Sequence, residues 1–350
     1  MVVRILKRIM LQPSICRSLV LAAIAALTPI SVPAVAGPAK LAQHTNPDPG
    51  SMAVSIKDTI QFNWGFQGQT QGAGTPNEIG IGGFLPLSVG TNSVLFLDAL
   101  ANVNLADIGN SSSIINTEVA GTTISTSSRL GYRWLNGERS WMFGVNAGYD
   151  SRPMGTGQVD TNVAATDSQT VFFQQVAAGL EAVSNSWNFN AYALVPIGVT
   201  EERLNSAYKG GALDTYGLDA GYSITPDLTA SVGYYYQNGD LDSADGSGVR
   251  GRLAYTISNG LTLGANLSYD QAFDTRFSAD LKYRFGSKGF SSPKKQRPTV
   301  TQATQALLAT PANRDVRVHD TDDVIIQSLG GGGQCITTPF GTPDVPICNF

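Results

Sequence analysis

Apolar and polar residues alternate one by one through much of the chain between residues 56 and 285. In 141–150, apolar residues fall at every second position, and Gly144, Asn146, Gly148 and Asp150 lie between them. Since successive side chains on a β-strand point to opposite faces, this period predicts strands with one apolar and one polar face. Twelve segments show it: 56–66, 77–85, 93–104, 121–134, 140–151, 170–181, 187–195, 212–222, 228–237, 248–257, 261–270 and 275–285.

The lengths of these segments and of their connections indicate a barrel that crosses a membrane. Most segments are ten to twelve residues long, close to the 9–11 or so that a tilted strand needs to cross a bilayer. Along almost the whole chain, long connections (67–76, 105–120, 152–169, 196–211, 238–247, 271–274) alternate with short ones (86–92, 135–139, 182–186, 223–227, 258–260). An up-and-down membrane barrel requires this alternation. A soluble two-sheet sandwich shares the strand period but has no reason for such loops.

Composition supports the same fold class. Charged residues make up 14% of the chain, below the roughly 25% of soluble globular proteins. Aromatic residues gather near predicted strand ends, as expected for rings at membrane interfaces. They are Trp134, Trp141, Tyr149, Trp187, Tyr222, Tyr234, Tyr236, Tyr269, Tyr283 and Phe285. We therefore predict an all-β protein: a twelve-stranded antiparallel transmembrane β-barrel at 56–285 with a short C-terminal extension.

The first 36 residues have the features of a secretory signal peptide. Four basic residues precede or flank the apolar run 19–27, and Ala34-Val35-Ala36 follows, which predicts cleavage between Ala36 and Gly37. An uncleaved anchor is the alternative, but nine apolar residues are too few to span a bilayer as a helix. Removing four of 23 basic residues and none of 27 acidic ones leaves a net charge of −8. This charge disfavours nucleic acid as a partner.

The remainder divides into a linker and a tail. Residues 37–55 are expected to form a periplasmic linker before the barrel. The tail, 286–350, contains a predicted helix within 299–310, a strand-like stretch at 315–328 and two cysteines, Cys335 and Cys348. In an oxidising compartment this pair is expected to close one small disulfide loop. An intermolecular bridge or a pair of free thiols is the alternative.

Four blocks of the barrel region resemble the β-domain of a known family. They are RLGYRWLNGERSWMFGVNAGYDS (129–151), QQVAAGLEAVSNSWNFNAYALVPIG (174–198), DTYGLDAGYSITPDLTASVGYYYQNGD (214–240) and YDQAFDTRFSADLKYRF (269–285). This strand–turn–strand sequence pattern resembles that of the twelve-stranded β-domain of inverse autotransporters, the intimin and invasin family. The resemblance covers roughly residues 56–285.

The resemblance implies an order of parts and an assembly signal. In that family the exported segment follows the barrel and passes back through its pore, so residues after 285 would form that segment. The stretch 276–285 would serve the barrel-assembly machinery through Ser278, Tyr283 and Phe285, although Asp280 stands where Gly is usual. No peptidoglycan-binding module precedes the barrel and no immunoglobulin-like repeats follow it, so a long adhesive rod is not expected.

Candidate chemistry is sparse. The only histidines are His44 and His319, which offer neither a Ser/His/Asp or Cys/His nucleophile nor a zinc site. We expect no enzymatic activity, no cofactor and no metal. Charged residues predicted to face the lumen are Asp150, Glu181, Asp219, Arg250, Arg252, Arg276, Asp280, Lys282 and Arg284. They either pair along the wall or form a cationic wall, at Arg250, Arg252, Arg276, Lys282 and Arg284, that holds a passing tail or favours anions.

The sequence thus predicts an outer-membrane barrel of inverse autotransporter type that anchors, threads and displays a short C-terminal segment. Its expected partners are the lipid bilayer of the outer membrane, the secretion and barrel-assembly machinery, and a surface ligand of unknown identity. A porin-like channel with a periplasmic tail is the first alternative. An adhesive surface protein that acts through the outer loops 152–169 and 196–211 is the second.

Overall fold

The protein was analysed as a computed structural model. The structure describes residues 56–106, 119–120, 122–156, 159–160, 163–164, 166–241, 244–258, 260–285, 301–322, 334–336 and 347–349. The predicted signal peptide 1–36 with its cleavage site at Ala36 and Gly37, the linker 37–55 and the second half of the strand-like stretch, 323–328, lie outside these residues.

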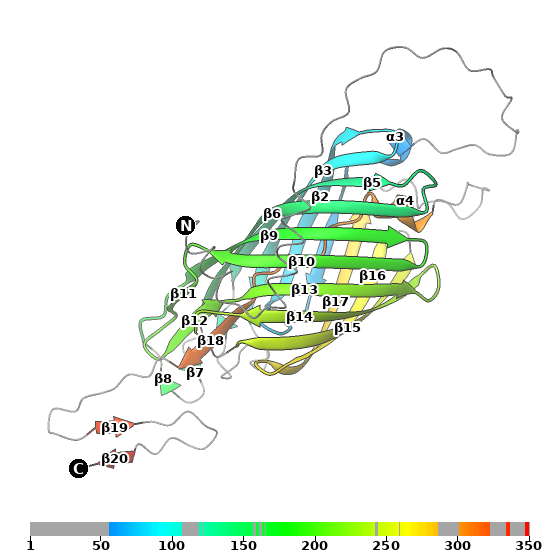
Figure 1. The fold of residues 1–350 in the computed structure, drawn as a ribbon. Coiled ribbons are helices and arrows are strands. Elements are labelled where there is room, and N and C mark those ends of the chain that lie inside the picture. The colour runs from blue at the N-terminus through cyan, green and yellow to red at the C-terminus, as the bar shows by residue number, and fades with distance from the viewer. Residues whose placement is uncertain are drawn as a thin grey trace, which may run out of the picture. The chain divides into compact units, whose positions relative to one another are not determined.

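Twelve antiparallel strands form one closed barrel, which confirms the predicted fold class (Figure 1). Each strand pairs with its neighbour in the chain, and β1 pairs with β17 to close the sheet. The strands are β1 (Asn63–Gln69), β2 (Asn77–Val89), β3 (Ser93–Leu105), β5 (Thr123–Leu135), β6 (Trp141–Thr156), β9 (Val171–Ser184), β10 (Trp187–Ile197), β13 (Asp214–Ser223), β14 (Leu228–Asn238), β15 (Gly246–Ser258), β16 (Leu261–Asp270) and β17 (Asp274–Phe285). Closure leaves no strand edge whose amides would face lipid.

The seam between the first and last strands is closely packed. Trp64 lies opposite Phe285 in the register, and their rings stack with centroids 4.6 Å apart. A Cβ atom at Gly65 would lie 1.8 Å from the carbonyl oxygen of Tyr283, so only glycine allows the two backbones to approach this closely. The residues assigned to an assembly signal thus lie at or near this seam. Their role in assembly stays a prediction.

The barrel has two different ends. Short turns such as 136–140 and 185–186 connect strands at one end, where β1 begins and β17 ends, and we call it the turn end. Connections such as 70–76 and 198–213 lie at the other, which we call the loop end. In outer-membrane barrels the short turns are periplasmic and the long loops external.

The outer wall of the barrel is apolar. Side chains on alternate strand positions are exposed, including Val232 at 69% and Phe277 at 67%. Near the turn end, rings from neighbouring strands form a continuous series whose adjacent centroids lie 4.9–6.4 Å apart. The series is Trp134, Phe143, Trp141, Phe189, Trp187 and Tyr222. An apolar band with an aromatic belt is the surface that a bilayer requires.

Helices play a small part in this fold. Among the described residues, none is long and apolar enough to cross a membrane.

The predicted first strand, 56–66, is wrong at its start. Residues Ile56–Thr59 form a short helix, α3, and β1 begins only at Asn63. Ile56 and Ile60 are four residues apart, so one helical turn buries both side chains on the same face. The apolar and polar residues alternate without interruption only from Ile60 onward.

Smaller elements extend the barrel and the tail. Within the predicted loop 196–211, β11 (Glu201–Arg203) and β12 (Tyr208–Ala212) form a hairpin, so β12 takes the start of the predicted strand 212–222. The predicted tail helix is α4 (Gln302–Ala306), and the strand-like stretch contains β18 (Val318–Asp322). The short strands β19 (Gln334–Ile336) and β20 (Ile347–Asn349) pair with Cys335 directly opposite Cys348. The disulfide between them stays a prediction.

The orientation of the wall leads to a test on one strand. Val232 faces outward in the middle of β14, whereas its neighbour Ser231 borders a cavity inside the barrel. Val232→Arg should lower the free energy of unfolding by about 2–4 kcal/mol, because an arginine at the bilayer midplane is costly. Ser231→Arg is the matched control and should cost clearly less. Urea unfolding in lipid vesicles measures both, and equal losses would contradict the assigned faces.

Candidate functional site: a chain segment inside the barrel

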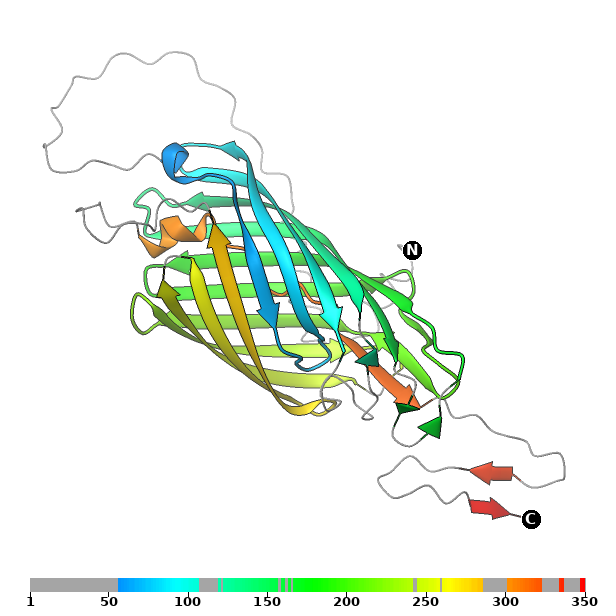
Figure 2. The same cartoon turned by 180° about the vertical axis from the view of Figure 1, so that it is seen from behind.

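The inside of the barrel holds the C-terminal portion of the chain, residues 301–322, which we call the tail segment (Figures 1 and 2). It begins with α4 at the turn end, continues as an extended stretch and ends in β18 at the loop end. The stretch 307–317 has eleven residues. At about 3.3 Å each they reach about 36 Å, more than the roughly 30 Å of bilayer hydrocarbon.

Apolar side chains surround the tail segment where it enters at the turn end. The rings of Phe84 and Phe96 stack with centroids 4.8 Å apart, and α4 packs in the same cluster. The cluster consists of Ile56, Ile60, Phe84, Val94, Phe96, Leu135, Met142, Ala303, Ala306 and Leu307. The amide of Gln302 also donates to Ser223 Oγ at 2.8 Å, at the end of β13. Both α3 and α4 therefore contribute to a plug that is mainly apolar.

Arg133 on β5 connects this plug to the wall. Its Nε lies 2.7 Å from Glu181 Oε2, and both side chains are buried. The same guanidinium donates to the carbonyl oxygens of Leu307, at 3.3 Å, and of Ala309, and lies 4.5 Å from the Phe96 ring centroid. One wall arginine thus binds a wall carboxylate and two carbonyl groups of the tail segment.

Midway through the lumen, Arg314 of the tail segment pairs with Asp98 on β3. The exposed fractions of the two side chains are 5% and 0%. The Nε of Arg314 donates to Ser127 Oγ at 2.7 Å, and Nη2 donates to the carbonyl of Ser127 at 3.0 Å. Among the described residues, Asp98 Oδ2 has no hydrogen-bond partner. The carboxylate therefore depends on the tail segment for its compensation.

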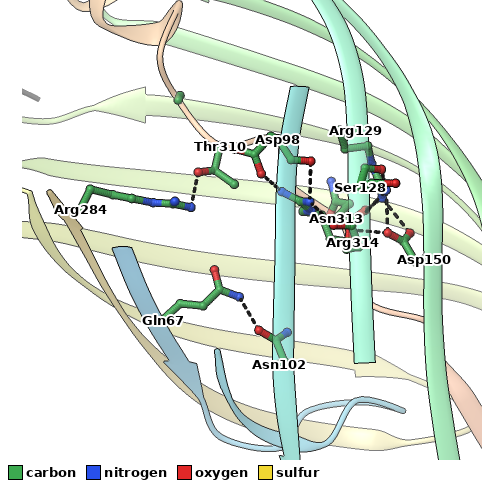
Figure 3. Close-up of polar contacts among 12 residues, drawn as sticks. Gln67, Asp98, Asn102, Ser128, Arg129, Asp150, Arg284, Thr310, Asn313 and Arg314 are labelled. Carbon is green, nitrogen blue, oxygen red and sulfur yellow. Dashed lines mark hydrogen bonds and ion pairs between the residues drawn. The ribbon is translucent and has the colours of Figure 1, made fainter. Parts of the chain in front are cut away.

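A second ion pair next to Arg314 lies within the wall (Figure 3). Arg129 Nη1 and Nη2 lie 2.6 and 2.8 Å from the two oxygens of Asp150, and Nη2 also donates to the carbonyl of Asn313 at 3.2 Å. Gln175 donates to Asp150 at 2.8 Å and to the carbonyl of Asp315 at 3.2 Å. The backbone of the tail segment is thus held by the same groups that satisfy the buried pair.

At the loop end, Arg317 of the tail segment contacts Asp270 at the end of β16, at 3.2 Å. It also donates to the carbonyl of Ala73 at 3.1 Å and lies 4.7 Å from the Tyr235 ring centroid. The main chain of the tail segment is held here as well: Leu213 N donates to Arg317 O at 2.9 Å, and Val318 N donates to Gly74 O at 3.1 Å. Two loops therefore hold the segment from either side.

Beyond these contacts the tail segment becomes part of a sheet. β18 pairs antiparallel with β12, with Gly211 opposite His319 and Lys209 opposite Thr321. β11 completes this three-stranded sheet at the loop end. Val316 and Val318 pack with Phe173 and Leu204 in a buried cluster.

His319 is fully buried in β18, outside the strands of the barrel. Burial lowers the pKa of its imidazole to about 4, although a backbone hydrogen bond with Asp320 acts in the opposite direction. The docked histidine is therefore neutral near pH 7.

The lumen residues predicted from sequence lie as follows. Asp150 and Glu181 pair with Arg129 and Arg133, while Asp219 pairs with Arg250 and Asp280 with Arg252. Arg284 donates to Thr310 of the tail segment (Figure 3), Arg276 lies on β17 opposite Ser268, and Lys282 borders the cavity described below. Ser278 borders the same cavity, and Tyr283 contacts the Phe285 ring edge-on at 4.4 Å.

Sequence reasoning missed the residues that hold the tail segment: Asp98, Arg129, Arg133, Arg152, Asp270, Arg314 and Arg317. The wall residues of this set occupy polar positions in the predicted strands or at their ends. The alternating pattern therefore predicts that their side chains point into the lumen. The partners of Arg314 and Arg317 were not, because 216 and 47 residues separate them in sequence.

A cavity of about 510 Å³ runs beside the tail segment. Its lining includes Asn190, Arg250, Asn266 and Lys282 of the wall and Pro311 of the tail segment. In the described part of the chain, no group of three or more His, Cys, Asp or Glu side chains could hold a metal ion. The arrangement can hold a peptide segment and water, and the expected lack of enzymatic activity stays a prediction.

Comparison with known proteins supports the fold. No family model matches the chain, and no curated protein matches it in sequence. A membrane protein from a study of in-meso crystallization aligns at 11% identity with a TM-score of 0.53, over 75% of this chain and 100% of that one. The outer membrane phospholipase dimer of Salmonella typhi with bound calcium aligns at 13% identity and a TM-score of 0.36, over 66% and 97%. An outer membrane channel from Pseudomonas putida F1 aligns at 11% and 0.38, over 64% and 92%.

Identities this low concern the fold alone. The fold is that of an outer-membrane β-barrel, and the apolar outer wall with its aromatic belt places it in a lipid bilayer. No comparison identifies the inverse autotransporter family.

The Arg314–Asp98 pair can be tested with a double-mutant cycle. Arg314→Met should weaken docking of the tail segment by about 3–5 kcal/mol, because it leaves a buried carboxylate uncompensated. Adding Asp98→Leu should restore most of this loss, since replacing both partners of a buried pair by apolar groups is often nearly neutral. Amide hydrogen exchange of residues 307–318 in nanodiscs reports the opening free energy. Additive losses would contradict the pairing.

Acid should loosen the loop end. An undocked histidine titrates near pH 6.5 and the docked one at about 4, so between these values the undocked state binds more protons. Docking then strengthens as pH rises from about 4 to 6.5 and is lost as pH falls through this window. Going from pH 7 to pH 5 should weaken docking of β18 by about 2 kcal/mol.

The measurement is hydrogen exchange in β18, corrected for the intrinsic pH dependence of exchange. His319→Leu is the control and should show a flat response between pH 5 and 7. If β18 of that variant lost as much protection from exchange at pH 5 as β18 of the parent, a group other than His319 would be responsible.

Proposed function

We propose that this barrel carries its own C-terminal segment through the outer membrane and holds it there, so that the residues after Asp322 stand on the cell surface. The observation that carries the proposal is the course of the tail segment, which enters at the turn end and pairs with β12 at the loop end.

Three features support threading rather than incidental filling of the lumen. The contacts with the tail segment are spread over its length, from Gln302 to Asp322. They involve both side chains and main-chain groups of the segment. They also include two arginines of the segment that meet buried carboxylates of the wall or its edge. A loosely packed filler would not need such pairs.

The direction of threading follows from the two ends of the barrel. The last strand ends at the turn end, and the tail segment starts again at that same end, at Thr301. If the turn end is periplasmic, the chain returns through the pore and emerges outside. The same order of barrel and exported segment is implied by the resemblance to inverse autotransporters noted in the sequence.

The porin-like alternative uses the same fold and lumen. It keeps the tail in the periplasm, whereas residues 307–317 contact the lumen wall and β18 pairs with β12 at the loop end. The adhesive alternative concerns loops 152–169 and 196–211, where β11 and β12 hold the tail segment through β18. Contacts made by that sheet are compatible with display of the residues beyond it.

Surface labelling of intact cells tests the proposal. An epitope tag added after Phe350 should bind antibody on intact cells, because the tail emerges at the loop end. A tag inserted in the 239–245 connection is the positive control, and a tag at Asn136-Gly137 in a short turn is the negative control. The proposal fails if the C-terminal tag becomes accessible only after the outer membrane is permeabilised, while the loop tag is accessible throughout.

A further inference from the structure

Asn313 has a strained backbone conformation inside the lumen. Its φ is +55°, in the left-handed region that residues with a side chain seldom adopt. The other described residues besides glycine with a positive φ, Arg139, Asp167 and Asp274, lie in or next to connections between strands. Asn313 instead lies within the extended stretch 307–317. Asparagine tolerates this conformation better than most residues, but strain of this kind clusters at sites of chemistry.

The side-chain amide of Asn313 is held at both of its ends. Arg250 Nη2 donates to Oδ1 at 2.6 Å, and Nδ2 donates to Asp219 Oδ2 at 3.4 Å. A guanidinium only donates and a carboxylate only accepts, so these partners fix which end of the amide carries the nitrogen. Asp219 also accepts from Arg250 Nε at 2.8 Å. Because a carboxylate has several lone pairs, Asp219 can still take a proton from the amide nitrogen.

The peptide bond between Asn313 and Arg314 is held on both sides. Arg129 Nη2 donates to the carbonyl oxygen of Asn313 at 3.2 Å (Figure 3). A cation fixed at a carbonyl oxygen stabilises the negative charge that develops there when a nucleophile adds to the carbon. On the other side of the bond, Arg314 is held by Asp98 and Ser127.

The nucleophile and the carbon that it would attack belong to the same residue. Joining Nδ2 to the main-chain carbonyl carbon of Asn313 closes a five-membered ring, and such intramolecular reactions have a very high effective concentration. An amide nitrogen is a weak nucleophile, so the reaction needs a group that removes its proton. Asp219 contacts that nitrogen, and Arg250 at Oδ1 draws electrons from the amide, which makes the proton easier to remove.

We infer that Asn313 cleaves the main chain between itself and Arg314 inside the barrel. Nδ2 adds to the carbonyl carbon of Asn313 and loses one proton to Asp219, while Arg129 stabilises the oxyanion. The C–N bond to Arg314 then breaks, and the proton passes from Asp219 to the leaving nitrogen. The first fragment ends in a succinimide ring, and the second begins at Arg314 with a free amine. Water from the adjoining polar cavity then opens the ring to a carboxylate and an amide.

A competing reaction of asparagine leaves the main chain intact. In deamidation, the main-chain nitrogen of Arg314 attacks the side-chain carbon of Asn313, and the proton leaves from that main-chain nitrogen. The carboxylate of Asp219 faces Nδ2 instead. The geometry therefore favours cleavage over deamidation.

Cleavage changes a covalent anchor into a non-covalent one. The fragment 314–350 keeps its ion pairs at Arg314 and Arg317 and the pairing of β18 with β12. It therefore stays docked in the folded barrel and leaves only when these contacts are lost. The inference is separate from display, because the cut does not depend on which side of the membrane the loop end faces.

Refolding of the purified full-length protein tests the inference. Protein unfolded in urea is transferred into lipid vesicles, and samples are denatured at intervals and analysed by mass spectrometry. We expect a 37-residue fragment that begins at Arg314 to accumulate at a rate independent of protein concentration. The other fragment should end at Asn313 and first appear lighter by one water than its hydrolysed form.

Variants assign the roles of the residues. Asn313→Gln should remove the cut, because glutamine would have to close a larger ring. Asp219→Asn should slow it by about a hundredfold or more through loss of the proton acceptor, and Asp219→Glu should restore part of the rate. Asn188→Gln, at another asparagine that borders the cavity, is the matched control and should cut at the parent rate. Variants are compared only as folded protein, judged by heat-modifiable mobility.

Three outcomes would overturn the inference. The first is a folded parent protein that stays intact for days. The second is an Asn313→Gln variant that is cut at the parent rate, and the third is an intact chain in which Asn313 has become aspartate. Each of these results leaves the surface-labelling test of display unaffected, so the two proposals fail separately.

Discussion

Charged groups buried inside a barrel must be compensated by other groups in the lumen, and in this protein the tail segment supplies part of that compensation. Asp98 is fully buried and its cation is Arg314, which comes from the far end of the chain. A lone buried carboxylate costs several kcal/mol. The stability of the barrel and the docking of the tail segment are therefore energetically coupled. The buried charge of Asp98 is compensated by Arg314 only when the segment is docked.

The coupling explains why the contacts occur at three levels. At the turn end, an apolar cluster packs α4 against the wall. At mid-height, the Arg314–Asp98 ion pair fixes the register of the tail segment. At the loop end, backbone pairing with β12 makes the segment a β-strand. Each level uses a different force, and a sliding movement of the tail segment by one residue would break the ion pairs and shift the β-ladder. Burial is insensitive to register, but the pairs and the β-ladder are specific.

The sequence was sufficient to predict the barrel because a membrane imposes a strict pattern on it. Outward positions must be apolar at every second residue, and that pattern was visible in segments such as 141–150 and 261–270. The start of β1 was missed because Ile56 and Ile60 satisfy a helical spacing as well as a strand period. The site was harder to predict. Its wall carboxylates were partly identified, including Asp150 and Glu181, but the tail arginines that meet Asp98 and Asp270 lie far away in sequence, and no local pattern indicates which charge meets which.

The central claim is that the chain after the barrel reaches the loop end through the lumen. Disulfide trapping between β12 and β18 tests it most directly, with Lys209→Cys and Thr321→Cys, which lie opposite each other in the register, in a background where Cys335 and Cys348 are replaced by serine. We expect mass spectrometry to find residues 209 and 321 bridged in protein isolated from oxidised membranes. A cysteine pair across the β1–β17 seam, at Gln67 and Lys282, is the positive control for oxidation. If the control pair forms a disulfide in folded protein and residues 209 and 321 do not, the account is contradicted.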